Sequence, residues 1–146
     1  MAKTYALVGT GGRARMFYEA ILGPHSAQSR LVALCDTNQT RMDYTNTVIE
    51  RELSGRAVPT YKAADFAAMI AERRPDTIIV TSIDRTHHKY IIAALEAGCD
   101  VITEKPMTID EEKCQAILDA VERTGRNVRV TFNYRYAPHN SALREL

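Results

Sequence analysis

Six consecutive residues near the amino end have the types and spacing of a phosphate-binding turn. They are Gly9, Thr10, Gly11, Gly12, Arg13 and Ala14, which match the pattern G-x-G-x-x-G/A with alanine in the third place. Gly9 permits a tight turn, Gly11 lacks a Cβ and lets a pyrophosphate approach the backbone, and Ala14 is small enough for a helix to pack closely on a strand. Free N–H groups at the start of that helix would bind the phosphates. The segment therefore predicts a dinucleotide site.

An acidic residue lies where this motif requires one. Asp36 follows Ala14 by 22 residues and comes directly after the apolar run 31–35, which is the position of a carboxylate that accepts hydrogen bonds from the adenosine ribose. The same carboxylate would repel the 2′-phosphate of NADP, so NAD is the favoured cofactor. Arg13 and Arg41 leave the use of NADP open, because a guanidinium binds phosphate through two parallel hydrogen bonds.

Two other interpretations of these residues exist. The glycines could form a surface turn, with Asp36 as the cap of a helix. The turn and the acid could also bind S-adenosylmethionine, since methyltransferases place an acid after a glycine turn as well. The strand before the turn, the helix after it and the acid at the end of the second strand together favour the dinucleotide site.

A lysine that could transfer protons follows the expected strand 101–103. Glu104, Lys105 and Pro106 stand at the carboxyl end of this strand, where ligands bind in open α/β sheets. Pro106 keeps Lys105 out of the helical region and so fixes how the chain leaves the strand. Glu104 could orient the ammonium group and stabilise its charge, although a lysine beside a glutamate is also the pattern of a solvated ion pair.

Short β-branched runs alternate with helical stretches along the chain, which is typical of βαβ units around a parallel sheet. Six strands are expected, at residues 4–8, 31–35, 58–61, 77–81, 101–103 and 128–132, and the third is the weakest. Apolar residues recur at helical spacing between these runs. The pattern predicts an α/β fold of the Rossmann type, with a doubly wound, mostly parallel six-stranded sheet and helices on both faces.

The ends of the expected helices carry recognisable signals. Thr108 and Glu111 have the spacing of a capping box, and Gly98 and Gly125 stand where helices should end. The stretch 38–53 is the least certain helix, because several of its residues are poor helix formers. These residues are Thr40, Thr45, Asn46 and Thr47.

The composition is that of a globular domain without a strong net charge. Apolar residues make up 45% of the chain, and 19 lysines and arginines nearly balance 18 aspartates and glutamates, so neither nucleic acid nor an acidic membrane is an expected partner. The apolar run 5–8 is too short for a signal peptide or a membrane span, which predicts a cytoplasmic protein. Cys35, Cys99 and Cys114 lack the spacing of a metal site, and we expect reduced core thiols and no bound metal.

The order and spacing of four motifs resemble those of the glucose-fructose oxidoreductase, inositol dehydrogenase and MocA (Gfo/Idh/MocA) family. The motifs are residues 9–14, 81–88, 94–98 and 104–106, and the resemblance covers essentially the whole chain. Family members transfer hydride between a carbon of a sugar or cyclitol and the nicotinamide of NAD or NADP. The resemblance implies that Lys105 is the catalytic lysine, that Glu104 contacts the same region, and that the Lys105–Pro106 peptide bond can be cis.

The resemblance also assigns cofactor contacts outside the glycine turn. These residues are Thr81, Ser82, Asp84, His87, Glu104, Lys105 and Asn133. The family commonly has Thr-Pro where this chain has Ser82 and Ile83, so the turn that carries Ser82 and Asp84 lacks a rigid proline. His87 is either the family's histidine beside the cofactor or a helix-start histidine that faces solvent.

Residues 1–133 are expected to form the NAD(P)-binding domain, and residues 134–146 to begin a truncated second domain for the substrate; a frayed terminal helix on a complete domain is the alternative. In relatives the second domain supplies another acid or base and the sugar pocket, so we expect this chain to bind cofactor with little or no activity. Apolar surface exposed without that domain predicts a homo-oligomer. The alternative function is a non-catalytic NAD(P)-binding or sensing module.

Overall fold

Six strands form a single sheet in the computed structural model, which describes residues 2–144. The strands are β1 (Lys3–Val8), β2 (Ser29–Asp36), β3 (Thr60–Lys62), β4 (Thr77–Val80), β5 (Asp100–Glu104) and β6 (Val128–Thr131). Their order is β3-β2-β1-β4-β5-β6, and every neighbouring pair is parallel. This is the Rossmann order. The expected fold class is confirmed, with a sheet that is parallel throughout and a third strand that begins at Thr60 rather than at residue 58.

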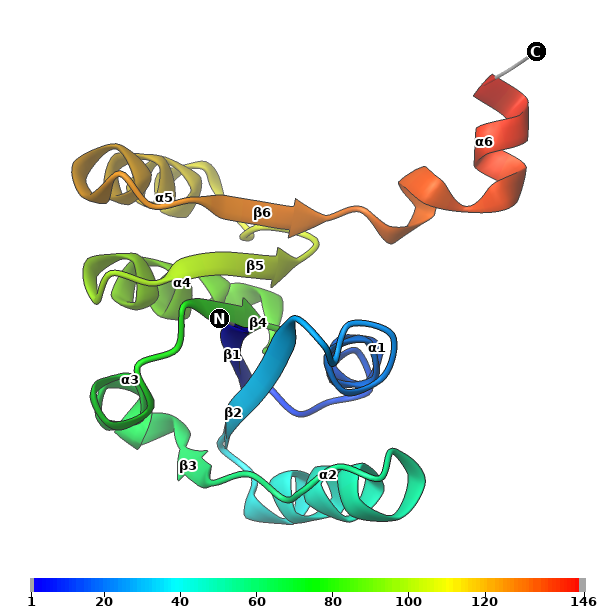
Figure 1. The fold of residues 1–146 in the computed structure, drawn as a ribbon. Helices are drawn as coiled ribbons and strands as arrows, with labels where there is room; N and C mark the ends of the chain where they lie inside the picture. The colour runs from blue at the N-terminus through cyan, green and yellow to red at the C-terminus, as the bar shows by residue number, and fades with distance from the viewer. Residues whose placement is uncertain (1, 145–146) are drawn as a thin grey trace.

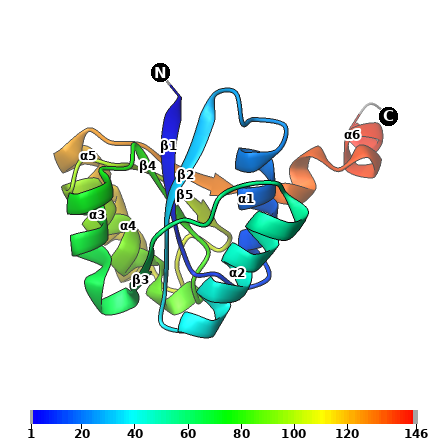
Figure 2. The same ribbon diagram turned by 60° about the horizontal axis from the view of Figure 1, so that its bottom comes forward.

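Helices cover both faces of the sheet (Figures 1 and 2). They are α1 (Ala14–Leu22), α2 (Gln39–Glu52), α3 (Phe66–Arg73), α4 (His87–Glu96), α5 (Glu111–Thr124) and α6 (Pro138–Arg144), with short 3-10 helices η1 (Ala63–Asp65), η2 (Asp84–Thr86) and η3 (Asn133–Tyr136). Helices α1 and α2 pack on one face, and α3, α4 and α5 on the other. In the central strand β1, Leu7 packs on the first side, and Ala6 and Val8 on the second. Side chains of a strand alternate between faces, so burial on both faces explains the continuous apolar runs.

The least certain helix of the sequence forms in full as α2. The side chain of Asn38 accepts a hydrogen bond from the backbone N–H of Arg41 and caps the first turn. Met42, Val48 and Ile49 are buried against the sheet. Tertiary packing of this apolar face therefore outweighs the poor intrinsic propensity of the threonines.

The expected capping box at the start of α5 is wrong. The cap is Asp110, whose carboxylate accepts from the backbone N–H of Lys113 at 2.9 Å, and the helix begins at Glu111. An aspartate two residues beyond Thr108 is the stronger cap, because its charge also faces the positive end of the helix. At the other end Gly125 has φ +65° and terminates the helix as expected.

The three cysteines are free thiols. Burial raises the pKa of Cys35 to about 12 and also raises the pKa of Cys99, so both are inert thiols of the core as expected, whereas Cys114 is only partly buried. Within residues 2–144, no group of three histidine, cysteine, aspartate or glutamate side chains is placed to hold a metal ion. None of the helices in this range could cross a membrane.

Helix α6 lies away from the sheet, beyond the end of β6 (Figures 1 and 2). It packs against η3, where the side-chain amide of Asn140 donates to the carbonyl of Tyr134 at 2.6 Å. The sequence predicts a helix here, although Glu145 and Leu146 at its end lie outside the described residues. The division of the chain at residue 133 stays a prediction.

Gly9 directly follows β1 and contacts the ends of the two neighbouring strands, β2 and β4. Its φ is +92°, and a Cβ at this position would lie 2.5 Å from the backbone nitrogen of Ser82. The N–H of Gly9 donates to the carbonyl of Cys35 at 2.8 Å, and its carbonyl accepts from the hydroxyl of Thr81 at 2.5 Å. The backbone conformation and this close contact exclude any other residue from the position.

We expect Gly9→Ala to lower the free energy of unfolding by about 2 kcal/mol or more, because the added methyl group requires a left-handed backbone and displaces the turn after β4. Gly11→Ala is the matched control, since a Cβ there would meet no atom within 4 Å, and its effect should stay below about 1 kcal/mol. Urea unfolding followed by circular dichroism measures both variants. Equal stability of the two would contradict the prediction.

Candidate functional site

The glycine-rich turn lies between the carboxyl ends of β1, β2 and β4, where the strand order reverses. Ala14 opens α1 and is fully buried, as the motif requires. Gly11 and Gly12 both have open space where a Cβ would stand. Backbone N–H groups that lead into a helix attract anions. The glycine turn therefore leaves room beside its backbone for a phosphate group to approach.

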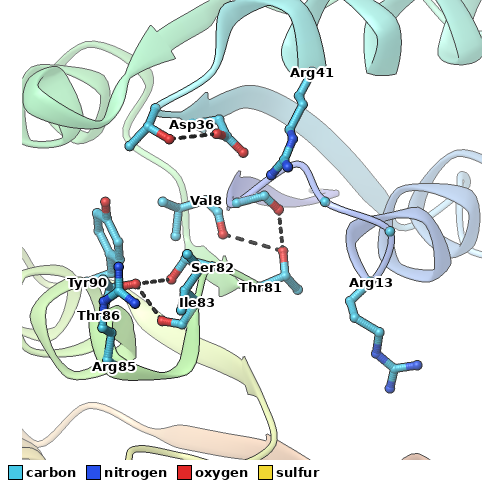
Figure 3. A pocket seen from close by; sticks show the side chains of 14 residues that line it. Val8, Arg13, Asp36, Arg41, Thr81, Ser82, Ile83, Arg85, Thr86 and Tyr90 are labelled. Carbon is cyan, nitrogen blue, oxygen red and sulfur yellow. Dashed lines mark hydrogen bonds between the residues drawn. The ribbon is translucent and has the colours of Figure 1, made fainter.

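A cavity of about 460 Å³ opens beside this turn (Figure 3). It is lined by Val8, Gly9, Gly11, Gly12, Arg13, Asp36, Thr37, Arg41, Thr81, Ser82, Ile83, Arg85, Thr86 and Tyr90. The lining thus combines the glycine turn with the segments that follow β2 and β4. The structure brings seven of the fourteen expected cofactor residues together around this cavity, namely Gly9, Gly11, Gly12, Arg13, Asp36, Thr81 and Ser82.

Six lining residues were not among the expected cofactor contacts. They are Val8, Thr37, Ile83, Arg85, Thr86 and Tyr90. Five of them lie at or shortly after the ends of β1, β2 and β4, so the expected strand ends were the available signal. Tyr90 lies one helical turn after Thr86 and reaches the cavity because residues four apart share a helix face.

Asp36 is a buried carboxylate, 6% exposed, that is already hydrogen-bonded within the protein. Its Oδ2 accepts from the backbone N–H of Thr10 at 2.6 Å and from the Thr10 hydroxyl at 2.9 Å. Its Oδ1 accepts from the backbone N–H of Asn38 at 2.9 Å and, more weakly, from the Thr37 hydroxyl at 3.3 Å. The sequence predicts a ribose contact for Asp36; the structure adds that its carboxylate holds the glycine turn in place.

The hydrogen bonds keep Asp36 ionised. Burial alone raises the pKa of this carboxyl group, but the bonds from Thr10, Asn38 and Thr37 outweigh burial and leave its pKa below the ordinary value. Because the pKa is lower in the fold than in the unfolded chain, the carboxylate stabilises the fold at neutral pH, and this contribution is lost as the pH falls through the folded pKa. At neutral pH the side chain that lines the cavity is therefore a charged acceptor, and the long bond from the Thr37 hydroxyl to Oδ1 is the weakest of its four hydrogen bonds.

The two arginines beside the glycine turn point in different directions. Arg41 extends from α2 toward the cavity near Asp36, whereas Arg13 points away from Asp36 (Figure 3). The guanidinium of Arg13 lies 3.2 Å from both carboxylate oxygens of Glu104. Arg13 is thus engaged by Glu104 while Arg41 is the arginine closer to Asp36, and the expectation that either could bind a 2′-phosphate stays a prediction.

Glu104 does not orient Lys105, contrary to the expectation from the sequence. Its carboxylate is 4% exposed and accepts from Arg13 and, at 2.8 Å, from the hydroxyl of Thr131 on β6. No hydrogen bond or ion pair joins Glu104 to Lys105 among the described residues. The pair of Arg13 and Glu104 joins the glycine turn to the strand end that carries the lysine.

Lys105 is exposed at the carboxyl end of β5, and the Lys105–Pro106 peptide bond is cis. The ammonium group has no ion-pair partner among residues 2–144. The expected strand-end position of this lysine is confirmed. Its side chain is therefore free to contact a ligand.

The turn after β4 keeps its shape without the proline that the family commonly has. The backbone N–H of Thr86 donates to the carbonyl of Ile83 at 2.7 Å, the Thr86 hydroxyl donates to the same oxygen at 2.6 Å, and this hydroxyl lies 2.9 Å from that of Ser82. Hydrogen bonds from Thr86 thus fix this turn in place of the proline ring that relatives commonly have. Ser82 lines the cavity as expected, whereas the exposed Asp84 does not.

His87 and Asn133 occupy very different surroundings. His87 is 1% exposed, so the interpretation as a solvent-facing histidine is wrong. Its ring is not part of the cavity lining. Asn133 is exposed at the start of η3, beyond β6, and the cavity does not include it.

Comparison with known proteins agrees with this geometry. A family model described as "Oxidoreductase family, NAD-binding Rossmann fold" matches residues 3–132. The chain belongs to this family, GFO_IDH_MocA. The matched residues include the glycine turn, Asp36 and Lys105, so the candidate site lies within the part that matches the family's NAD-binding fold.

Individual members of the family cover most of this chain. A D-glucoside 3-dehydrogenase of Escherichia coli is 30% identical over 79% of this chain and 30% of its own length. An inositol 2-dehydrogenase of Klebsiella pneumoniae is 42% identical over 57% of this chain and 25% of its own length. The WlbA dehydrogenase of Chromobacterium violaceum, solved with NADH and UDP-GlcNAcA, is 25% identical, with a TM-score of 0.80 over 99% of this chain and 39% of its own. The chain spans about a third of the length of the curated relatives it matches.

We expect Glu104→Gln to lower the free energy of unfolding by about 1–2 kcal/mol, because it removes the charge that the Arg13 guanidinium faces at a buried position. The loss is smaller than for a fully buried pair, since half of the Arg13 side chain is exposed. Glu96→Gln breaks the exposed pair with Arg123 and should cost less than about 0.5 kcal/mol. Urea unfolding compares the two, and an effect of Glu104→Gln no larger than that of Glu96→Gln would refute the structural role of the pair.

Proposed function

We propose that the chain is the cofactor-binding part of an oxidoreductase that transfers hydride between NAD(H) and a hydroxyl or carbonyl carbon of a sugar or cyclitol. The observation that carries the proposal is the cavity at the strand ends, with the glycine turn on one side and the ionised Asp36 on the other. Relatives named for glucosides and inositols support the substrate class. We assign turnover to a protein of the relatives' full length, because these relatives are about three times as long as this chain.

The lining divides into parts suited to the pieces of a dinucleotide. The backbone N–H groups of Gly11 and Gly12 would hold the pyrophosphate, and Asp36 the adenosine ribose through Oδ1. Ile83 and Tyr90 offer apolar surface to the adenine ring. Thr10 supports this set indirectly, because both of its donors are used by Asp36.

Lys105 is the residue we propose for proton transfer. It follows β5, next to the central strand β4, and its ammonium group is exposed at the edge where the cofactor site lies. An ammonium donor can bind the reacting oxygen of a hydroxyl or carbonyl and share its proton. Bound nicotinamide would supply the hydride acceptor or donor. Glu104 does not contact the lysine but binds Arg13, and through Arg13 it holds the glycine turn.

Two further expectations stay predictions. The contact of Asn133 with the nicotinamide side would need η3 to lie close to the bound cofactor, and its exposed position leaves the side chain free to reach a ligand. Self-association is supported by the large exposed apolar side chains of Phe132, Tyr134 and Leu143 near the carboxyl end.

The direct test titrates NADH and NADPH by fluorescence against the chain and against Asp36→Ala. A hydrogen bond to a charged group is worth about 1.5–3 kcal/mol, so we expect NADH affinity to fall about tenfold or more and the preference for NADH over NADPH to shrink. A smaller folded fraction weakens the apparent affinity for both cofactors by the same factor, so the ratio of the NADH and NADPH affinities is unaffected by it. Asp43→Ala, an exposed change on α2, is the control. An unchanged NADH affinity in Asp36→Ala, or binding of S-adenosylmethionine in place of NADH, would refute the assignment.

The direction of Arg41 gives a separate prediction about NADPH. Arg41→Ala should weaken NADPH several-fold more than NADH, because only NADPH carries the 2′-phosphate that a guanidinium binds. Arg13→Ala is the matched control: its guanidinium faces Glu104, so any effect on the pyrophosphate should be equal for the two cofactors. The same fluorescence titrations measure both ratios. A larger change of the ratio in Arg13→Ala would show that the guanidinium directions are misassigned.

A further inference from the structure

His87, the first residue of α4, is a buried polar side chain without a role in the site described above. It is 1% exposed and ranks among the largest fully buried side chains of the described residues. Burying an imidazole costs free energy unless its nitrogens are hydrogen-bonded. Its partners therefore show why the fold keeps a histidine here.

Both ring nitrogens face a backbone carbonyl. Nε2 lies 2.9 Å from the carbonyl oxygen of Ser82, and Nδ1 lies 2.9 Å from the carbonyl oxygen of Pro106. Ser82 lines the cofactor cavity, and Pro106 follows Lys105 through the cis peptide bond. No other hydrogen bond between described residues joins these two turns. One side chain thus lies within hydrogen-bond distance of both the cavity wall and the turn that carries the lysine.

The chemistry of this bridge is specific to histidine. Carbonyl oxygens only accept hydrogen bonds, so each bond requires an N–H on the ring. A neutral imidazole carries one N–H and can bind one carbonyl at a time, whereas a ring protonated on both nitrogens binds both. A glutamine amide of similar reach has its donors on a single atom. Glutamine can therefore keep one end of the bridge but not both.

We propose that His87 is a positioning residue that fixes the Lys105 turn relative to the wall of the cofactor cavity. Binding in the cavity and the placement of Lys105 are then coupled through the imidazole. The inference rests on the proposed function, in which Lys105 transfers a proton beside the cofactor. A displacement of about 1 Å in a reacting group can cost roughly 100-fold in rate, so a rigid link between the two turns would matter for catalysis.

The test labels lysines of the chain with an acylating reagent, with and without saturating NADH, and follows Lys105 by mass spectrometry. Lys89, exposed on α4, is the internal reference. NADH should slow the labelling of Lys105 in the wild type. In His87→Gln this protection should fall by at least about fivefold, the lower range of coupling between sites, while NADH affinity falls much less. His88→Gln makes the same change one residue along the helix and should retain the protection.

The outcomes separate the inference from the proposed function. If NADH protects Lys105 equally in the wild type and in His87→Gln, the bridge is refuted and the function of Lys105 stands. If NADH binds the wild type without protecting Lys105, the role of Lys105 beside the cofactor is refuted, and the positioning role with it. If His87→Gln does not fold, nuclear magnetic resonance of the wild type with 15N-labelled histidine decides: two protonated ring nitrogens support the bridge, and one bare nitrogen refutes it.

Discussion

The hydrogen bonds between Asp36 and Thr10 are the interaction on which the cofactor site depends. They join the end of β2 to the glycine turn after β1. They also keep a buried carboxylate charged, because the backbone N–H and the hydroxyl of Thr10 both donate to Oδ2 of Asp36. A buried charge is tolerated when its hydrogen bonds are complete. The turn is thus held in place by the protein itself, and the other oxygen, Oδ1, has one weak bond, from the Thr37 hydroxyl, that a ligand could replace.

Two further bridges extend this rigidity toward Lys105. Arg13 and Glu104 link the glycine turn to the end of β5, and His87 links the turn after β4 to Pro106. Each bridge places a polar group at a buried position, so each one is stable only in the correct geometry. The lysine itself is left exposed, while the backbone around it is held from two sides. Such support of a mobile side chain by a fixed surrounding shell is what accurate placement of a reacting group requires.

The sequence predicted what depends on local pattern. The strands and the helices follow from apolar periodicity, and the glycine turn with Asp36 follows from a motif whose spacing is set by one βαβ unit. The partner of Glu104 could not be predicted in this way, because Arg13 lies 91 positions away and the contact depends on which side of β5 the carboxylate faces. The burial of His87 is also a tertiary property, since its two acceptors come from turns after different strands. At the start of α5, the spacing of Thr108 and Glu111 gave the wrong cap, because the carboxylate of Asp110 caps the first turn instead.

The position of β1 at the centre of a parallel sheet has a consequence for how the chain acquires its structure. One edge of β1 can pair with β2 as soon as about the first quarter of the chain is available, but its other edge pairs with β4, which begins at Thr77. Closing so long a loop has an entropic cost that must be met before the pairing is gained. Until then one edge of the central strand β1 is open to pairing with other chains, so newly made protein is most vulnerable to aggregation before β4 has formed.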